Sequence, residues 1–348
     1  MHSDGRNHSI DLLRVAGGLV VMSAHVALPP WLFQLRNFGA PMLVVVSALA
    51  TQLLHGQRAL NAGAFLRRRL PKLTLQPWAF LAIFFLCAEA MALVKGRPFP
   101  FSREEVINSF TFSGGIGYLW IFRVYILVAL ITPPLLSLYR AAPSMRAYLT
   151  GVGLLYAGAE LARIVLHAGW SEASWRAALD EIVFTPLPYA LLFAYGLALP
   201  KLSDAAVRRA ALAAAAVFAA LASWQYAATG AFVPTQAQKY PPTAYYLAYA
   251  FACIHLVYLA LRHARLPVSV APVIAWLSSH LLWIYLWHVF ALFAWATVVG
   301  HADEPSLKSA LELTVVVAVA MVATWMQFRM LRWWRRADLA ARLRAAGR

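Results

Sequence analysis

The feature that most constrains this chain is a succession of apolar stretches, each about 20 residues long. The 348 residues are 62% hydrophobic and only 13% charged, whereas a soluble domain carries roughly 25% charged residues. An α-helix needs about 20 apolar residues to cross the hydrocarbon core of a bilayer, and its backbone polar groups must bond internally there. The sequence therefore predicts an all-α, polytopic integral membrane protein.

Ten stretches meet this description, and we predict one membrane-spanning helix for each. The predicted spans are Ile10–Leu28, Phe38–Leu54, Leu73–Val94, Ile116–Tyr139, Tyr148–Leu166, Ile182–Leu199, Ala210–Ala228, Ala244–Leu261, Val273–Val298 and Leu307–Met330. The seventh is the weakest of these, because Ala-rich segments insert only marginally. We predict a single transmembrane domain over residues 1–330 and a basic cytoplasmic tail over residues 331–348.

The distribution of Lys and Arg predicts the orientation of these spans. With the N-terminus inside, twenty of the 30 Lys and Arg residues fall in cytoplasmic segments and seven in outer segments. Cytoplasmic loops carry such an excess. We therefore predict that both termini are cytoplasmic and that the Arg- and Trp-containing tail contacts membrane lipids. The location that we expect for this multi-pass protein is a bacterial inner membrane.

Composition and motifs exclude several other classes. The net charge of +16 follows from the positive-inside loops, so nucleic acid is not an expected partner. Cys87 and Cys253 both lie in apolar runs, and the His residues form no HExxH pattern, so we expect no disulfide framework and no metal. There is also no Walker loop, Rossmann glycine fingerprint or G-x-S-x-G elbow. No pattern indicates an oligomeric state.

The first predicted span contains two groups that could carry chemistry, Arg14 and His25. An ionisable group inside the membrane usually faces a cavity and marks a function. Eleven residues is about three helical turns, or ~16 Å of rise, so both side chains would share one helix face. Arg14 could bind phosphate, and His25 could accept a proton from a hydroxyl group. The structural alternative has equal weight: Arg14 pairs with Asp11, and His25 makes an interhelical hydrogen bond.

Five segments in order resemble the acyltransferase 3 family, membrane proteins that move acyl groups onto sugars and other hydroxyl acceptors. The hallmark of the family is a basic residue, ten further residues and then His, as in Arg14 and His25. Four more segments match family motifs: FGAPMLVVVSALA (38–50), FLRRRLPKL (65–73), GYLWIFRVYILVALITPPLL (117–136) and WIYLWHVF (283–290). The chain departs from the pattern at Lys72, which replaces an Arg, and at Leu281-Leu282, which replaces a Ser-aromatic pair. The soluble esterase-like domain of some relatives is not expected here.

The resemblance implies a reaction and roles for particular residues. It implies transfer of an acyl group, most simply acetyl, from cytoplasmic acyl-CoA to a hydroxyl of a glycan or lipid-linked sugar. His25 and Arg14 would be catalytic, with His25 as base or transient acyl carrier, and Arg14, Arg69 and Lys72 would bind the donor. The residues expected at the acceptor are Trp120, Arg123, Tyr285 and His288. For Tyr285 and His288 an interhelical structural role is equally compatible with the sequence.

Two further readings of the sequence stay open. A transporter or flippase would also bury charges, although such proteins often have duplicated halves with matching broken spans, and no such symmetry is evident. The other major type of membrane-bound O-acyltransferase uses an intramembrane His, expected later in the chain than the first span. The acyltransferase 3 reading carries a geometric expectation: Arg14 and His25 frame one tunnel long enough for a thioester cofactor.

Overall fold

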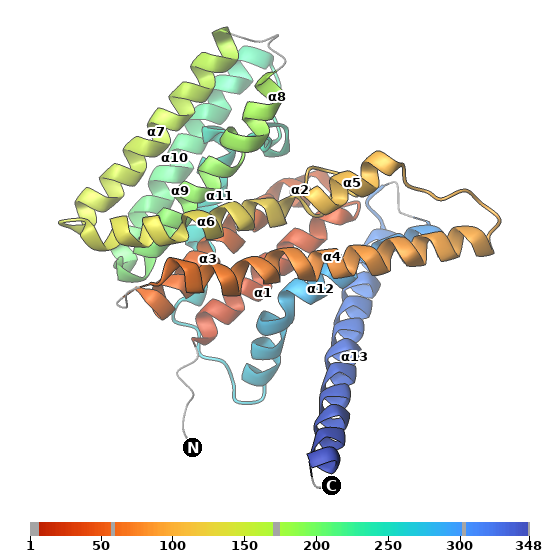
Figure 1. Cartoon of the computed structure of the whole chain (residues 1–348). Helices are drawn as coiled ribbons and strands as arrows, with labels where there is room; N and C mark the ends of the chain where they lie inside the picture. The colour runs from red at the N-terminus through yellow and green to blue at the C-terminus, as the bar shows by residue number, and fades with distance from the viewer. Residues whose placement is uncertain (1–6, 57–59, 170–174, 301–303, 347–348) are drawn as a thin grey trace.

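The computed structural model describes residues 7–56, 60–169, 175–300 and 304–346, and in these ranges the chain forms helices and no strand. The α-helices are α1 (His8–Met22), α2 (Pro30–Leu35), α3 (Gly39–His55), α4 (Ala62–Val94), α5 (Arg103–Thr111), α6 (Trp120–Ala141), α7 (Met145–Gly169), α8 (Trp175–Leu179), α9 (Pro186–Ala198), α10 (Asp204–Thr229), α11 (Ala244–Leu261), α12 (Ala271–Val298) and α13 (Leu307–Ala346). Figure 1 shows their arrangement. The predicted all-α class is confirmed.

The helices are long and apolar enough for a membrane protein. Within the described residues, nine helical segments have the length and hydropathy to cross a bilayer. They correspond to the second through tenth predicted spans, and they include the Ala-rich α10, which spans 26 residues. The chain is therefore a multi-pass membrane protein.

The first predicted span, Ile10–Leu28, is wrong as a continuous helix. The 15-residue α1 ends at Met22, a 3-10 turn follows at Ser23–His25, and Val26 is extended with φ −124° and ψ 159°. The tighter turn is stabilised by the Ser23 hydroxyl, which donates to the Val20 carbonyl at 2.9 Å. A 3-10 turn has about 3.0 residues per turn, so Arg14 and His25 do not share one regular helix face.

Small residues let the central helices approach one another closely. A Cβ on Gly196 of α9 would lie 2.7 Å from the Ala48 Cβ of α3. On α1, a Cβ on Gly17 would lie 2.9 Å from Leu43 of α3, and one on Gly18 would lie 2.5 Å from Leu281 of α12. Such contacts are typical of helix interfaces in membranes, where small residues let the helix backbones approach closely. They hold α1 between α3 and α12, which places Arg14 and His25 inside the bundle.

The last helix runs through the predicted boundary between domain and tail. We placed the end of the tenth span at Met330, but α13 continues to Ala346 without interruption. Its C-terminal turns extend beyond the other helices at the lower edge of Figure 1. The basic segment after Met330 is thus a continuation of the spanning helix.

Candidate active site

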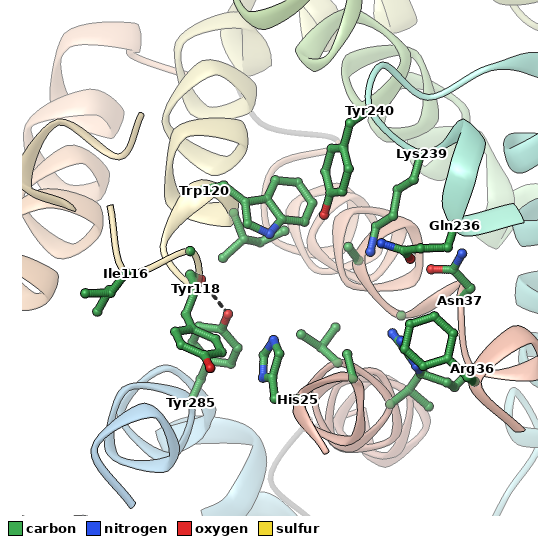
Figure 2. A pocket seen from close by; sticks show the side chains of 18 residues that line it. His25, Arg36, Asn37, Ile116, Tyr118, Trp120, Gln236, Lys239, Tyr240 and Tyr285 are labelled. Atoms are coloured by element: carbon green, nitrogen blue, oxygen red, sulfur yellow. Dashed lines mark hydrogen bonds between the residues drawn. The ribbon is translucent and has the colours of Figure 1, made fainter. Parts of the chain in front are cut away.

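A cavity of about 360 Å³ opens beside His25. Its walls come from the end of α1 with the turn after it, α2 with the segment after it, the start of α3, the start of α6 with the segment before it, the connection between α10 and α11, and Tyr285 of α12. This volume lies within the range of about 300–1,000 Å³ that is typical of small-molecule sites. We call it the His25 cavity. Figure 2 shows it from close by.

One wall of this cavity, the histidine side, consists of His25, Tyr118 and Tyr285. The His25 Nδ1 lies 2.8 Å from Nε2 of His288, which is fully buried behind it. The Nδ1 of His288 is in turn hydrogen bonded to the Tyr285 carbonyl. A carbonyl only accepts, so His288 Nδ1 carries the hydrogen, and in the uncharged ring its Nε2 accepts from His25 Nδ1. The Nε2 of His25 is then left with a lone pair, as a general base requires.

Two tyrosines fix the position of the His25 ring. The Tyr285 hydroxyl donates to the Tyr118 carbonyl at 2.6 Å, the bond drawn as a dashed line in Figure 2. The Tyr118 ring packs edge-on against His25, with ring centroids 4.7 Å apart. Together with the His288 bond, these contacts hold the imidazole from two directions.

The opposite wall, the cationic side, consists of Arg36, Asn37, Gln236 and Lys239. It is built by joining the α10–α11 connection to the segment between α2 and α3. The Asn37 amide donates to the Thr235 hydroxyl at 2.9 Å, and the Thr235 backbone N–H donates to Gln34 Oε1 at 3.0 Å. These bonds bring two segments that are some two hundred positions apart in the sequence to one surface.

Lys239 is the most perturbed charged group of this wall. It lies outside the spanning helices, in the α10–α11 connection. Burial, and then the positive charge of Arg36, lower the pKa of Lys239 to about 7. Both causes act against the protonated form. Its charge therefore changes near neutral pH.

A second cavity, of about 230 Å³, is lined by Arg14 and Arg69. We call it the Arg14 cavity. Arg14 Nη1 donates to the Ser278 hydroxyl at 3.0 Å and lies 3.9 Å from the Asp11 carboxylate. The sequence left open whether Arg14 lines a cavity or pairs with Asp11, and in the structure it does both. Arg69 Nη2 lies 3.5 Å from the Ser47 hydroxyl. Two guanidinium groups thus contribute to one small cavity.

The two cavities lie at different levels of α1 and toward opposite ends of α3, and they have no lining residue in common. The expectation of one open tunnel framed by Arg14 and His25 is therefore wrong for this structure. Between the two positions, α1 is packed against Leu43 at Gly17 and against Leu281 at Gly18. A layer of side chains separates the two sites.

A family model described as an acyltransferase domain matches residues 7–328, nearly the whole chain. The chain belongs to the acyltransferase 3 family. Comparison with curated proteins and comparison with solved structures gave no significant match. Family membership assigns acyltransferase chemistry in general to this multi-pass membrane protein.

The structure brings together most, but not all, of the residues that the acyltransferase 3 motifs singled out. Trp120 and Tyr285 line the His25 cavity, and His288 supports His25 from behind. Arg123 lines neither of the two cavities and instead pairs with Glu181. Lys72 is exposed and lies outside the Arg14 cavity that Arg69 lines.

Motif matching did not single out the cationic side of this acyltransferase 3 protein. In the sequence, Arg36 and Lys239 are two of the seven Lys and Arg residues of the outer segments. Lys239 has Tyr240 as its neighbour and lies near the Trp120 ring, with Nζ 5.6 Å from the ring centroid. An aromatic residue next to a lone cation in an outer loop was the signal that could have found this wall.

Proposed function

We propose that this protein moves an acyl group, most simply acetyl, from cytoplasmic acyl-CoA to a hydroxyl of a glycan or lipid-linked sugar at a bacterial inner membrane. The observation that carries the proposal is the pairing of His25 with His288, which leaves a basic nitrogen on a ring that lines a cavity. Membership of the acyltransferase 3 family supports the class of reaction.

The Arg14 cavity suits the anionic end of the donor. With both termini cytoplasmic, the start of α1, the end of α3 and the start of α4 face the cytoplasm. Guanidinium groups bind phosphate through paired, directional N–H donors. Arg14 and Arg69 would hold phosphates of coenzyme A, and its thioester arm would extend along α1 toward His25. Lys72, exposed near the same helix end, would at most attract the donor from solution.

His25 would act as the general base in the transfer step. The acceptor hydroxyl donates to His25 Nε2, and its oxygen attacks the thioester carbonyl carbon. His25 takes the hydroxyl proton as the new C–O bond forms. The C–S bond then breaks, and the proton passes from His25 to the departing thiolate, which yields an ester and free coenzyme A. General base catalysis of this kind contributes about 10²–10⁴-fold to a rate.

The packed layer between the cavities sets a requirement for this reaction. The thioester has to pass the level of Gly17 and Gly18, where Leu43 and Leu281 contact α1. Because α1 has a glycine at each contact, the path is obstructed there by two flexible side chains, those of Leu43 and Leu281. Rotation of the leucines and small helix shifts would admit the arm, and such motions occur in microseconds to milliseconds.

The test is acetyl transfer by the full chain in proteoliposomes, with acetyl-CoA on the cytoplasmic face. His25→Ala is expected to abolish transfer while acetyl-CoA binding persists, and Arg14→Ala is expected to weaken that binding. His280→Ala serves as the matched control, because His280 stacks on Trp276 and lines neither cavity. Transfer at the wild-type rate by His25→Ala protein would remove His25 from the chemistry.

A transporter is the second candidate, because two cavities toward opposite ends of α3 also fit alternating access. The same preparation separates the two functions. An acyltransferase consumes the thioester and releases free thiol, whereas a transporter moves solute and leaves the thioester intact. Thiol release that depends on His25 would decide for acyl transfer.

A further inference from the structure

The cationic side of the His25 cavity contains two buried positive groups. Arg36 is 7% exposed and Lys239 is 9% exposed. Among the residues that the structure describes, no Asp or Glu lines this cavity or forms an ion pair with either cation. A buried charge is normally paired, because burying an unpaired one is costly.

Aromatic rings are the neighbours that these cations have instead. The Arg36 guanidinium carbon lies 3.8 Å from the Phe33 ring centroid, and Lys239 Nζ lies 5.3 Å from that of Tyr240. Attraction to a ring face is weaker than the loss of hydration on burial. The Nε of Arg36 also has no hydrogen-bond partner among the described residues. The two cations therefore carry uncompensated positive charge, and Arg36 has an unused N–H donor, with which this wall can bind an oxyanion.

Uncharged groups beside the cations match the rest of a sugar. The amide oxygens of Asn37 and Gln236 are buried and have no hydrogen-bond partner within the described part of the chain. Both residues line the cavity, so they can accept from hydroxyl groups. The Trp120 ring forms a neighbouring wall. Cations, free amide acceptors and an aromatic face together fit a polyhydroxylated anion better than a bare ion.

We propose that the acceptor sugar carries an oxyanion, a carboxylate or a phosphate ester, which Arg36 and Lys239 bind while a hydroxyl of the same sugar reaches His25. This inference rests on the proposed function for the reaction, but the binding part of it stands without any transfer. The geometry carries it: in Figure 2 the cationic side and the histidine side face each other across one cavity.

This arrangement would also determine which hydroxyl is acylated. The anion is fixed at one wall by two charges, and His25 is fixed at the other by His288 and Tyr118. Only a hydroxyl at the matching distance from the anionic group can donate to His25 Nε2. Positional selectivity then follows from the spacing of the two walls.

The first arm of the test measures binding to the purified full chain without an acyl donor. The probes are methyl β-glucuronide for the carboxylate, glucose 1-phosphate for the phosphate ester, neutral methyl β-glucoside and inorganic phosphate. At least one anionic sugar is expected to bind tenfold or more tighter than the glucoside, and whichever binds tighter identifies the source of the anion. Equal binding of the glucoside, or equally tight binding of inorganic phosphate, would overturn the proposal.

Variants of the two cations give a second, independent readout. In Arg36→Gln/Lys239→Met protein the preference for the anionic sugar is expected to fall to within twofold, and Arg36→Lys is expected to keep most of it. Arg103→Gln is the matched control, because Arg103 is exposed on the same predicted side of the membrane and its loss removes one charge outside the cavity. A preference unchanged in the double variant would contradict the proposal. Probe competition in the wild-type protein decides the question even if the double variant does not fold.

A third measurement adds acetyl-CoA to the purified protein and the sugar probes, and it separates this proposal from the proposed function. Preferred acetylation of the anionic sugar would support both. Intact preference in binding, with no release of free coenzyme A in the presence of any acceptor, would contradict acyl transfer and leave the anion site in place. Equal rates of acetylation for the charged and the neutral sugar would support the transferase and overturn the anionic acceptor.

Discussion

His25 and His288 are joined ring to ring by a 2.8 Å hydrogen bond, although 263 positions separate them in the sequence. The bond links the 3-10 turn after α1 to the middle of α12, and His288 is anchored in turn by its own helix at the Tyr285 carbonyl. The direction of the hydrogens along this chain determines which nitrogen of His25 is basic. His288 is therefore a positioning residue for the proposed base.

Replacing His288 tests that role. His288→Phe keeps a ring but removes the acceptor, so kcat for acyl transfer is expected to fall roughly 10–100-fold, a part of the about 10²–10⁴-fold that a general base contributes. KM for the acceptor should stay within about twofold, because His288 does not line the cavity. His288→Gln, which retains an acceptor atom, should recover part of kcat. An equal loss in both variants would point to a packing role.

Arg69 and Lys72 are expected to behave differently, although both belong to the same sequence motif. Arg69 lines the Arg14 cavity and Lys72 is exposed outside it. A hydrogen bond to a charged group is worth about 1.5–3 kcal/mol, so Arg69→Gln should raise KM for acyl-CoA roughly 10–100-fold. Lys72→Gln should change KM by less than about twofold, as expected of a screened surface charge. Steady-state kinetics with acetyl-CoA measure both, and similar effects of the two changes would place Lys72 at the donor.

Gly18→Ala is expected to overpack α1 against Leu281. A Cβ there would lie 2.5 Å from Leu281 Cδ1, and overpacking of this kind costs about 1–3 kcal/mol. Gly18→Ala should therefore lower the thermal midpoint in detergent and slow transfer. Leu281→Ala in the same chain should restore much of both, giving a coupling that two independent sites would not show. Additive losses would mean that the two residues are not in contact.

Binding of an anionic sugar is expected to weaken as the pH rises through neutrality. Burial and the Arg36 charge lower the pKa of free Lys239 to about 7, and a bound anion would raise that pKa again because it favours the charged form. Below pH 7 the lysine is already protonated, so affinity should be level. Above pH 7 binding must take up a proton, and affinity should fall by up to about tenfold per pH unit. Titration of methyl β-glucuronide binding from pH 6 to 9 measures this, and Lys239→Met should flatten the profile.

Removing Lys239 and removing Arg163 should affect stability in opposite directions. Lys239 has no carboxylate partner among the described residues, so Lys239→Met should raise the thermal midpoint of the sugar-free protein. Arg163 makes two 2.8 Å hydrogen bonds to Glu160, so Arg163→Met should lower stability by roughly 1–3 kcal/mol by leaving that carboxylate unpaired. Thermal unfolding in one detergent compares them. A lower midpoint for Lys239→Met would show that the lysine stabilises the empty cavity.

The features that depend on local sequence were predictable. Nine of the ten spans could be placed from hydropathy because each is a continuous apolar stretch. The Glu160–Arg163 ion pair of the structure depends only on local spacing, because residues three positions apart are neighbours on a helix surface. The further hydrogen bond that the Ala244 backbone N–H of α11 donates to the Glu160 carboxylate, at 2.9 Å, was not predictable, because it depends on helix packing.

The features that depend on tertiary packing were not predictable in the same way. In the first span α1 ends before Ser23, whose hydroxyl bonds to the Val20 carbonyl as the chain turns toward α2, and hydropathic periodicity does not report such a turn. The cationic side forms only when Arg36 and Lys239, some two hundred positions apart in the sequence, come together in the fold. A single sequence without covariation data does not show that they are close in space. Hydropathy likewise could not show that leucines close the space between Arg14 and His25.

The layer at Gly17 and Gly18 has a consequence for the cell. An open passage between Arg14 and His25 would let water and small ions leak across the bilayer. Leucines occupy that level, and under the proposed function they would move aside for the thioester-bearing arm and close the path again when it withdraws. Under the proposed function, two carbons could then change compartments while the costly nucleotide carrier stays inside and the membrane remains electrically tight.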